Sequence, residues 1–99
     1  MLICGVDPGI ARLGYALLKQ EAGRLEVRSF GCLETPADLP SPQRLLCLYE
    51  QLAQVLAAQP RAVAIEALFF NKNVRTAFSV AEARGVVLLL CAERGIPVF

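Results

Sequence analysis

Leu2-Ile3-Cys4-Gly5-Val6-Asp7-Pro8-Gly9-Ile10-Ala11-Arg12-Leu13-Gly14-Tyr15 is the stretch of this chain from which the fold can be worked out. Its first five residues form an apolar run that Pro8-Gly9 stops, which predicts a fully buried strand. Asp7 stands at the end of that strand, and an aspartate is poorly suited to a strand interior and costly to bury unpaired. Its position therefore requires either a hydrogen-bonded turn or a cation.

A turn is a sufficient explanation for Asp7-Pro8-Gly9 taken alone. Proline fixes its own φ, glycine supplies a positive φ, and aspartate can bond backbone amides two residues further on. For this motif in isolation we favour the turn over a metal ligand, and both explanations stay open.

Composition predicts a single domain over residues 1–99, because a chain of this length supports one core. Hydrophobic residues make up 56% of the chain and charged residues 19%, which favours a sheet covered on both faces or a buried partner surface. The longest uncharged apolar run, 85–92, is much shorter than the roughly 20 residues of a membrane helix. No secretory signal is present, so we expect no membrane association and a cytoplasmic location.

The chain has four irregularly spaced cysteines and no histidine. This pattern argues against zinc and predicts reduced thiols in the core. Without histidine, any chemistry must depend on carboxylates, lysines or metal ions. Ten basic residues against nine acidic ones give a net charge of +1, which argues mildly against nucleic-acid binding by this chain alone.

Three strands open the predicted fold. After the first come strands at about 13–18 and 25–35, joined by a turn at 21–24, and such short connections require an antiparallel meander. Gly14 and Gly31 fall inside these strands, where glycine often marks a bulge or a close backbone approach.

Two helices alternate with two further strands in the second half. Ser41 and Pro42 predict a helix start, as N-cap and first helical residue, and an apolar period of 3.6 residues follows until Gln59-Pro60. Residues 61–66 then predict a strand parallel to the first, because a helix precedes it. Asn73 predicts the cap of a long helix over 74–94 that Gly95 ends, and 96–99 begin another strand.

The long helix and the connection before it offer surfaces with two interpretations each. Small residues at Ala77, Ala81, Ala83 and Gly85 allow close packing, either against the sheet or against another subunit. The Phe69-Phe70 pair in the connection is more typical of a core than of a binding surface.

Asp7 and Glu66 each close a strand, and the predicted order β-β-β-α-β-α-β allows those strands to be neighbours. Functional sites in open α/β sheets gather at the carboxyl ends of the strands. Oxygen ligands suit Mg²⁺ or Mn²⁺, and two such ions can support phosphodiester hydrolysis without histidine. The spacing makes a metal site at this edge plausible.

Several motifs together resemble the RuvC family of bacterial Holliday-junction resolvases. They are Gly5-Val6-Asp7-Pro8-Gly9 with Gly14-Tyr15, Ala64-Ile65-Glu66 followed by Phe69, Lys72 and Asn73, Ala83-Arg84-Gly85, and Ile96-Pro97-Val98-Phe99. The resemblance implies a ribonuclease H-like α/β fold, with a mixed sheet of a three-stranded antiparallel meander plus parallel strands. It also implies a homodimer that nicks four-way junction DNA symmetrically with Mg²⁺, or with Mn²⁺, and a possible complex with a branch-migration motor.

Site residues follow from the same resemblance. Asp7 and Glu66 match the first two of four catalytic, metal-binding carboxylates. Phe69, Lys72, Asn73 and Arg75 would contact DNA. The helix from Val74 would pair subunits, with an interface that includes Ala77, Ala81, Arg84 and Gly85.

The sequence departs from the family pattern chiefly after Phe99, where the resemblance would add two further aspartates and several basic residues. We therefore expect a C-terminally truncated domain that holds metal weakly and is inactive alone. Leu13 and Glu82 stand where a small hydroxyl residue and an amide are common. A non-catalytic dimerisation or DNA-binding module of the same fold and an actin-like phosphotransferase fragment remain the alternatives.

Overall fold

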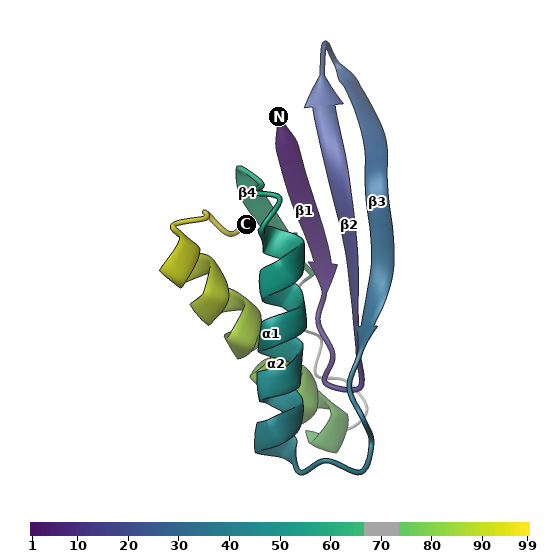
Figure 1. Cartoon of the computed structure of the whole chain (residues 1–99), viewed down its shortest axis with the longest axis vertical. Coiled ribbons are helices and arrows are strands. Elements are labelled where there is room, and N and C mark those ends of the chain that lie inside the picture. The colour runs from purple at the N-terminus through teal and green to yellow at the C-terminus, as the bar shows by residue number, and fades with distance from the viewer. Residues whose placement is uncertain (67–73) are drawn as a thin grey trace.

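The chain folds into a four-stranded sheet and two long helices (Figure 1). The structure, a computed structural model, describes residues 1–66 and 74–99, and the side chains of the second range from residue 76 onward. The elements are β1 (Leu2–Asp7), β2 (Arg12–Glu21), β3 (Arg24–Glu34), α1 (Ser41–Leu56), β4 (Ala62–Ile65) and α2 (Val74–Arg94). This order confirms the predicted succession up to the last helix.

The sheet has the spatial order β3-β2-β1-β4. β1 pairs antiparallel with β2 and parallel with β4, so it lies in the interior of the sheet with a neighbour on each side. The predicted final strand at 96–99 is present as a short parallel pairing with β4: Val98 forms a bridge with Val63, Val63 N–H donates to Pro97 O, and Phe99 N–H donates to Val63 O, both hydrogen bonds at 2.9 Å. Pro97 takes part through its carbonyl, so its missing N–H does not prevent this pairing.

The two faces of the sheet differ, because side chains alternate along each strand. Cys4, Val6 and Leu13 point to the face that α1 and α2 cover, and all three are buried. The other face carries Ile3 and Gly5, which are only half-buried. The prediction that β1 is fully buried is therefore wrong for one face among the described residues.

The core lies between the covered face of the sheet and the two helices. α1 contributes Leu48, Leu52 and Leu56, which follow the predicted 3.6-residue period. α2 contributes four buried residues from one side of the helix. They are Ala83, Val87, Leu90 and Cys91.

Helix ends show where local sequence rules succeed and fail. At α2, Gly95 has φ +67° and its N–H donates to Ala92 O, while Ile96 N–H donates to Cys91 O at 2.9 Å, so the predicted glycine stop is confirmed. At α1 the predicted serine cap is wrong: Pro40 is the N-cap residue and no side chain caps the helix.

At two positions glycine is needed because a Cβ atom would come too close to a neighbouring atom. Gly9 does not have a positive φ, but a Cβ there would lie 2.3 Å from Arg12 O, so a close backbone approach demands glycine. Gly31 faces Tyr15 across the β2–β3 pair, and a Cβ there would come within 3.0 Å of the tyrosine Oη. The irregularity in this pair lies between Leu17 and Leu18, not at a glycine.

The thiols are all free, and only two of them are core residues. Cys4 and Cys91 are buried, and burial raises the pKa of the Cys4 thiol to about 11. Cys32 is exposed and Cys47 is half-buried, which corrects the prediction that all four are core thiols.

Candidate active site

Asp7 closes β1 at the carboxyl end of the sheet. Its cross-strand partner on β2 is Gly14, where a Cβ would lie 3.7 Å from the Asp7 Cβ. The missing side chain leaves space beside the carboxylate, which is exposed. By strand alternation Asp7 lies on the face of the sheet that the helices do not cover.

Glu66 directly follows β4 and reaches the same edge. The β1–β4 ladder ends at the pair Val6 and Ile65, and the Glu66 N–H donates to Val6 O at 3.2 Å. This register places Glu66 level with Asp7 on the neighbouring strand and on the same face. The predicted convergence of the two carboxylates is therefore present in the fold.

The two acidic side chains interact directly. A hydrogen bond with Asp7 and then the repulsion of its negative charge raise the pKa of Glu66 above its usual range, with a small contribution from burial. Two carboxylates within hydrogen-bonding reach of each other must share a proton or bind a cation to relieve the repulsion. The edge is thus suited to a positive ion.

The donor set fits a hard divalent cation. Both side chains offer oxygen, and both are exposed enough for water to complete an octahedral shell around Mg²⁺ or Mn²⁺. Within residues 1–66 and 76–99 no group of three or more His, Cys, Asp or Glu side chains forms a metal cluster. Asp7 and Glu66 would therefore be the only acidic ligands from the described part of the chain.

Most of the predicted DNA-contacting residues cannot be placed. Phe69, Lys72 and Asn73 lie outside the described residues, and so does the side chain of Arg75. The preceding Glu66 and the start of α2 at Val74 bracket this connection.

The predicted interface residues lie along α2 beside its buried side. Ala77, Ala81 and Arg84 are half-buried and Gly85 is exposed. A Cβ at Gly85 would meet no described atom within 4 Å, so this glycine is not needed for a contact with the described sheet. Of the small residues, Ala83 alone belongs to the core.

Sequence reasoning missed two large apolar residues next to this set. Phe78 and Leu89 are 67% and 59% exposed, although both lie within a long helix. With Glu82 and Gly85 they follow the spacing i, i+4, i+7 and i+11, which places them on one stripe of α2. This spacing is visible in the sequence and could have predicted the exposed stripe, but the prediction considered only the small residues of the helix.

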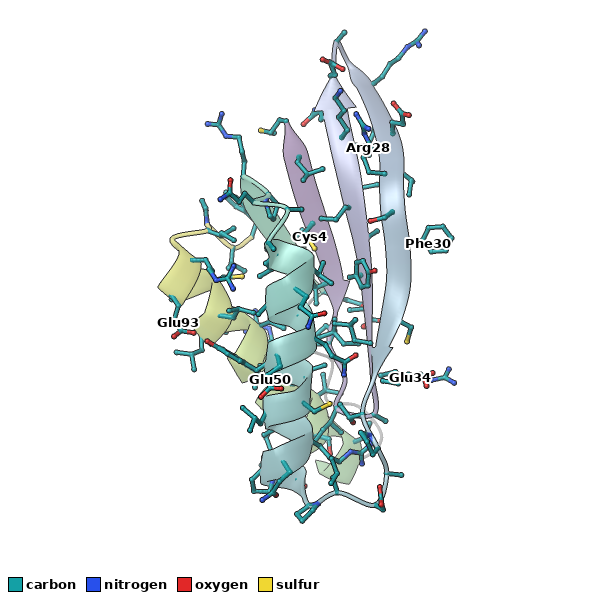
Figure 2. The ribbon with its side chains drawn as sticks, in the orientation of Figure 1. Cys4, Arg28, Phe30, Glu34, Glu50 and Glu93 are labelled. Atoms are coloured by element: carbon teal, nitrogen blue, oxygen red, sulfur yellow. The ribbon has the colours of Figure 1, made fainter. Side chains whose placement is uncertain are left out.

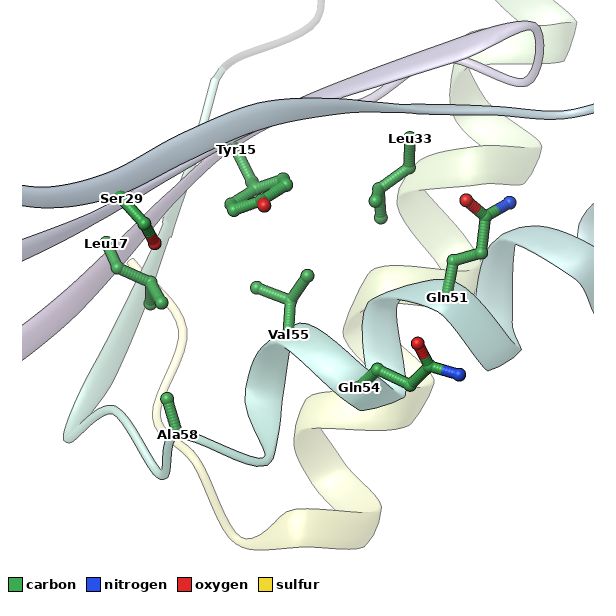
Figure 3. Close-up of a pocket in the computed structure, with 8 residues that line it drawn as sticks. All are labelled: Tyr15, Leu17, Ser29, Leu33, Gln51, Gln54, Val55 and Ala58. Atoms are coloured by element: carbon green, nitrogen blue, oxygen red, sulfur yellow. The ribbon is translucent and has the colours of Figure 1, made fainter.

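A separate groove of about 410 Å³ lies on the covered side, between α1 and the β2–β3 pair (Figure 3). Figure 3 shows Tyr15 and Val55 facing each other across it, with the amides of Gln51 and Gln54 on the helix side. None of its described lining residues is charged. This groove is therefore distinct from the edge that carries Asp7 and Glu66.

Comparison with known proteins agrees with this geometry. The profile of the family described as "Crossover junction endodeoxyribonuclease RuvC" matches residues 3–99. The chain belongs to the RuvC family. Membership of this family argues against the actin-like phosphotransferase alternative.

Two relatives and one solved structure show how close the match is. The protein named crossover junction endodeoxyribonuclease RuvC from Desulfitobacterium hafniense (strain DSM 10664 / DCB-2) is 50% identical over 100 residues, covering 100% of this chain and 61% of the relative. The protein of that name from Thermomicrobium roseum (strain ATCC 27502 / DSM 5159 / P-2) is 53% identical over 100 residues, covering 99% of this chain and 60% of the relative. T. thermophilus RuvC in complex with Holliday junction substrate superposes with a TM-score of 0.91 at 30% identity, covering 100% of this chain and 64% of that one.

These matches confirm the predicted ribonuclease H-like mixed sheet. They also show that the chain spans about three-fifths of the length of the RuvC relatives. Neither helix that the structure describes is long and apolar enough to cross a membrane.

Proposed function

We propose that this chain supplies Asp7 and Glu66 to the active site of a metal-dependent endonuclease that cleaves four-way DNA junctions. The observation that carries the proposal is the pairing of these carboxylates at one sheet edge, where Asp7 raises the pKa of Glu66, in a chain of the RuvC family. Recombination and repair of DNA would be its setting, in the cytoplasm.

Asp7 and Glu66 would hold Mg²⁺, with Mn²⁺ as the alternative, because both ions prefer oxygen ligands. If Asp7 and Glu66 hold such an ion, it would supply the chemistry that activates a water molecule and stabilises the leaving oxygen of the phosphodiester. The two side chains contribute negative charge from the ends of neighbouring strands, and the strand pairing fixes their relative position along the strand direction. Their exposure on the uncovered face leaves room for a DNA strand.

Junction DNA is the proposed substrate because the RuvC neighbour from T. thermophilus is described in complex with a Holliday junction. In our proposal Phe69, Lys72, Asn73 and Arg75 contact that DNA from the connection between β4 and α2. Positively charged side chains would bind phosphates, which position a nucleic acid without reading its sequence.

A homodimer is proposed as the functional assembly. The stripe of Phe78, Glu82, Gly85 and Leu89 on α2 leaves two large apolar side chains exposed around a glycine, which is the pattern of a helix that packs closely against a partner. Ala77, Ala81 and Arg84 border that stripe. Because a four-way junction presents two equivalent strands, two copies of the site would cut both. A branch-migration motor remains a proposed further partner.

A non-catalytic module of the same fold is the second candidate. It is favoured by one observation: the described residues bring together only two carboxylates, fewer than a three-ligand cluster. The nuclease requires further acidic ligands, supplied either by the same reading frame or by a partner chain. The non-catalytic module has no such ligands.

The decisive experiment compares junction binding and Mg²⁺-dependent cleavage for three proteins: this 99-residue chain, the polypeptide encoded by the whole reading frame, and Asp7→Asn in that polypeptide. We expect the whole product to nick four-way junctions, Asp7→Asn to bind them without cutting, and the 99-residue chain to be inactive. Binding without cleavage by the unsubstituted product would support the non-catalytic module. Equal affinity for junction and plain duplex would overturn the junction assignment.

A further inference from the structure

Thr35, immediately after β3, is a buried polar residue whose hydrogen-bonding groups all have partners. It is 8% exposed. Its N–H donates to Ala11 O at 3.2 Å and its hydroxyl donates to Ile10 O at 2.6 Å. Arg44 Nε donates to the same hydroxyl oxygen at 3.0 Å, and Arg44 Nη2 donates to Thr35 O at 3.5 Å.

These bonds connect the first turn of α1 to the turn that follows Asp7. Two consecutive carbonyls of that turn, at Ile10 and Ala11, are held by Thr35, and Thr35 is held by Arg44. Within the turn, Gly9 lies so close to Arg12 O that no Cβ fits between them. The backbone between Asp7 and β2 therefore has little freedom.

Asp7 needs such support because its strand pairing, among the residues that the structure describes, is one-sided. Among the described residues the β1–β4 ladder stops at Val6 and Ile65, so the one ladder partner of Asp7 there is Gly14 on β2. Repulsion from Glu66 acts from the unpaired side. Any looseness in the turn would let the two carboxylates move apart.

Thr35 and Arg44 cannot act on a cation directly. By strand alternation Thr35 belongs to the face that α1 covers, as Leu33 does, whereas Asp7 lies on the uncovered face. Their influence on the site must pass through the backbone of the turn.

We propose that Thr35 and Arg44 are positioning residues that fix the turn over residues 8–11, and through it hold Asp7 at the separation from Glu66 that a shared divalent cation requires. This inference rests on the proposed metal-dependent nuclease function. Groups that orient a metal ligand without touching the metal commonly change metal affinity by about 10- to 100-fold when they are removed.

The test measures Mn²⁺ affinity, by electron paramagnetic resonance of the free ion, in the polypeptide encoded by the whole reading frame. We expect Thr35→Val, which keeps the shape but loses the hydroxyl, to weaken Mn²⁺ binding about tenfold. Thr35→Ser should restore it. Arg44→Met is the second variant, because it leaves the bond from Thr35 to Ile10 intact and should have a smaller effect in the same direction.

Gln51→Met is the matched control. Gln51 Nε2 donates to Glu34 O at 2.9 Å, so it also joins α1 to the end of β3, but it does not hold the turn. It should lower the thermal midpoint without changing Mn²⁺ affinity. If Thr35→Val lowers the midpoint but leaves Mn²⁺ affinity unchanged, the positioning role is wrong and the bonds serve stability alone.

Failure of the proposed function gives a different result. If Asp7→Asn binds Mn²⁺ as tightly as the unsubstituted protein, Asp7 is not a ligand, and the proposed site itself is wrong whatever Thr35→Val does. If Asp7→Asn abolishes binding and Thr35→Val does not weaken it, the site stands and the positioning inference is overturned.

Discussion

At the scale of single residues, the Asp7–Glu66 pair predicts opposite pH trends with and without metal. In the metal-free chain the raised pKa means that folded Glu66 binds its proton more tightly than unfolded Glu66 does. The free energy of unfolding is therefore larger below the usual pKa of glutamate and decreases as pH rises through the raised pKa. A bound divalent cation favours both ionised carboxylates and should reverse this trend.

Urea denaturation between about pH 4 and pH 7, with and without Mn²⁺, checks this prediction. Asp7→Asn is the control, because it removes the carboxylate whose hydrogen bond and negative charge together raise the pKa of Glu66, and it should flatten the metal-free trend. Identical pH trends in the unsubstituted chain and in Asp7→Asn would show that the two carboxylates do not interact.

Gly31 gives a second prediction at this scale. Gly31→Ala would bring a Cβ to within 3.0 to 3.2 Å of three atoms of Tyr15, a large ring that the β2–β3 pairing holds in place. We expect a loss of about 1–2 kcal/mol in the free energy of unfolding, as for overpacking of a small space. Gly5→Ala is the control, since a Cβ there meets no described atom within 4 Å, and it should be neutral or slightly stabilising.

Helix ends supply the prediction at the scale of elements. Gly95→Ala should cost about 1 kcal/mol, because Gly95 has φ +67° and alanine adopts this region with difficulty. Ser41→Ala should change the free energy of unfolding by less than about 0.5 kcal/mol, because no side chain caps α1. Chemical denaturation of both variants tests the contrast, and an equal cost for both would contradict it.

The same elements show what the sequence can and cannot determine. Periodicity identified α1, whereas α2 was predicted from Asn73 as cap and Gly95 as stop. Gly95 could be identified because the glycine stop depends only on local backbone geometry. Ser41 was wrongly predicted as the N-cap because Pro40 and Pro42 both suit a helix start. Which residue becomes the cap depends on the direction in which the preceding loop joins the helix. Residues 96–99 were predicted as a strand, and they pair parallel with β4 around one bridge, in which Pro97 contributes its carbonyl.

The sequence predicted the two carboxylates of the candidate site but not the residues that support them. Asp7 and Glu66 could be brought together from the sequence because strand ends and a right-handed crossover determine which residues share an edge. Thr35 and Arg44 could not be found in this way. Their bonds join residues 25 and 9 positions apart, and neither residue belongs to a motif.

At the scale of the whole molecule, the uncovered face of the sheet governs access to the site. Figure 2 shows the Phe30 side chain projecting from β3 away from α1, and this residue is 77% exposed. Asp7 and Glu66 open toward the same uncovered side, while α1 and α2 fill the other. The carboxylates and the α2 stripe thus belong to different parts of the surface, so their roles can be separated by substitution.

The last prediction uses that separation. Leu89→Glu in the polypeptide encoded by the whole reading frame should convert the proposed homodimer to a monomer, because it places a second negative charge, in addition to that of Glu82, on the stripe of α2 that would face the partner. Leu46→Glu is the matched control: this leucine is 56% exposed on α1, away from the stripe, and its substitution should leave the dimer intact. Sedimentation velocity measures both.

Mn²⁺ affinity should be the same in Leu89→Glu as in the unsubstituted protein, since the proposed ligands Asp7 and Glu66 belong to one chain. Coordinated cleavage of both strands of a four-way junction should be lost, because it needs two sites held together. If the Leu89→Glu protein stays dimeric, the subunit interface does not include this stripe. A monomer that still cuts both strands in one binding event would show that the pairing of subunits is not what couples the two cuts.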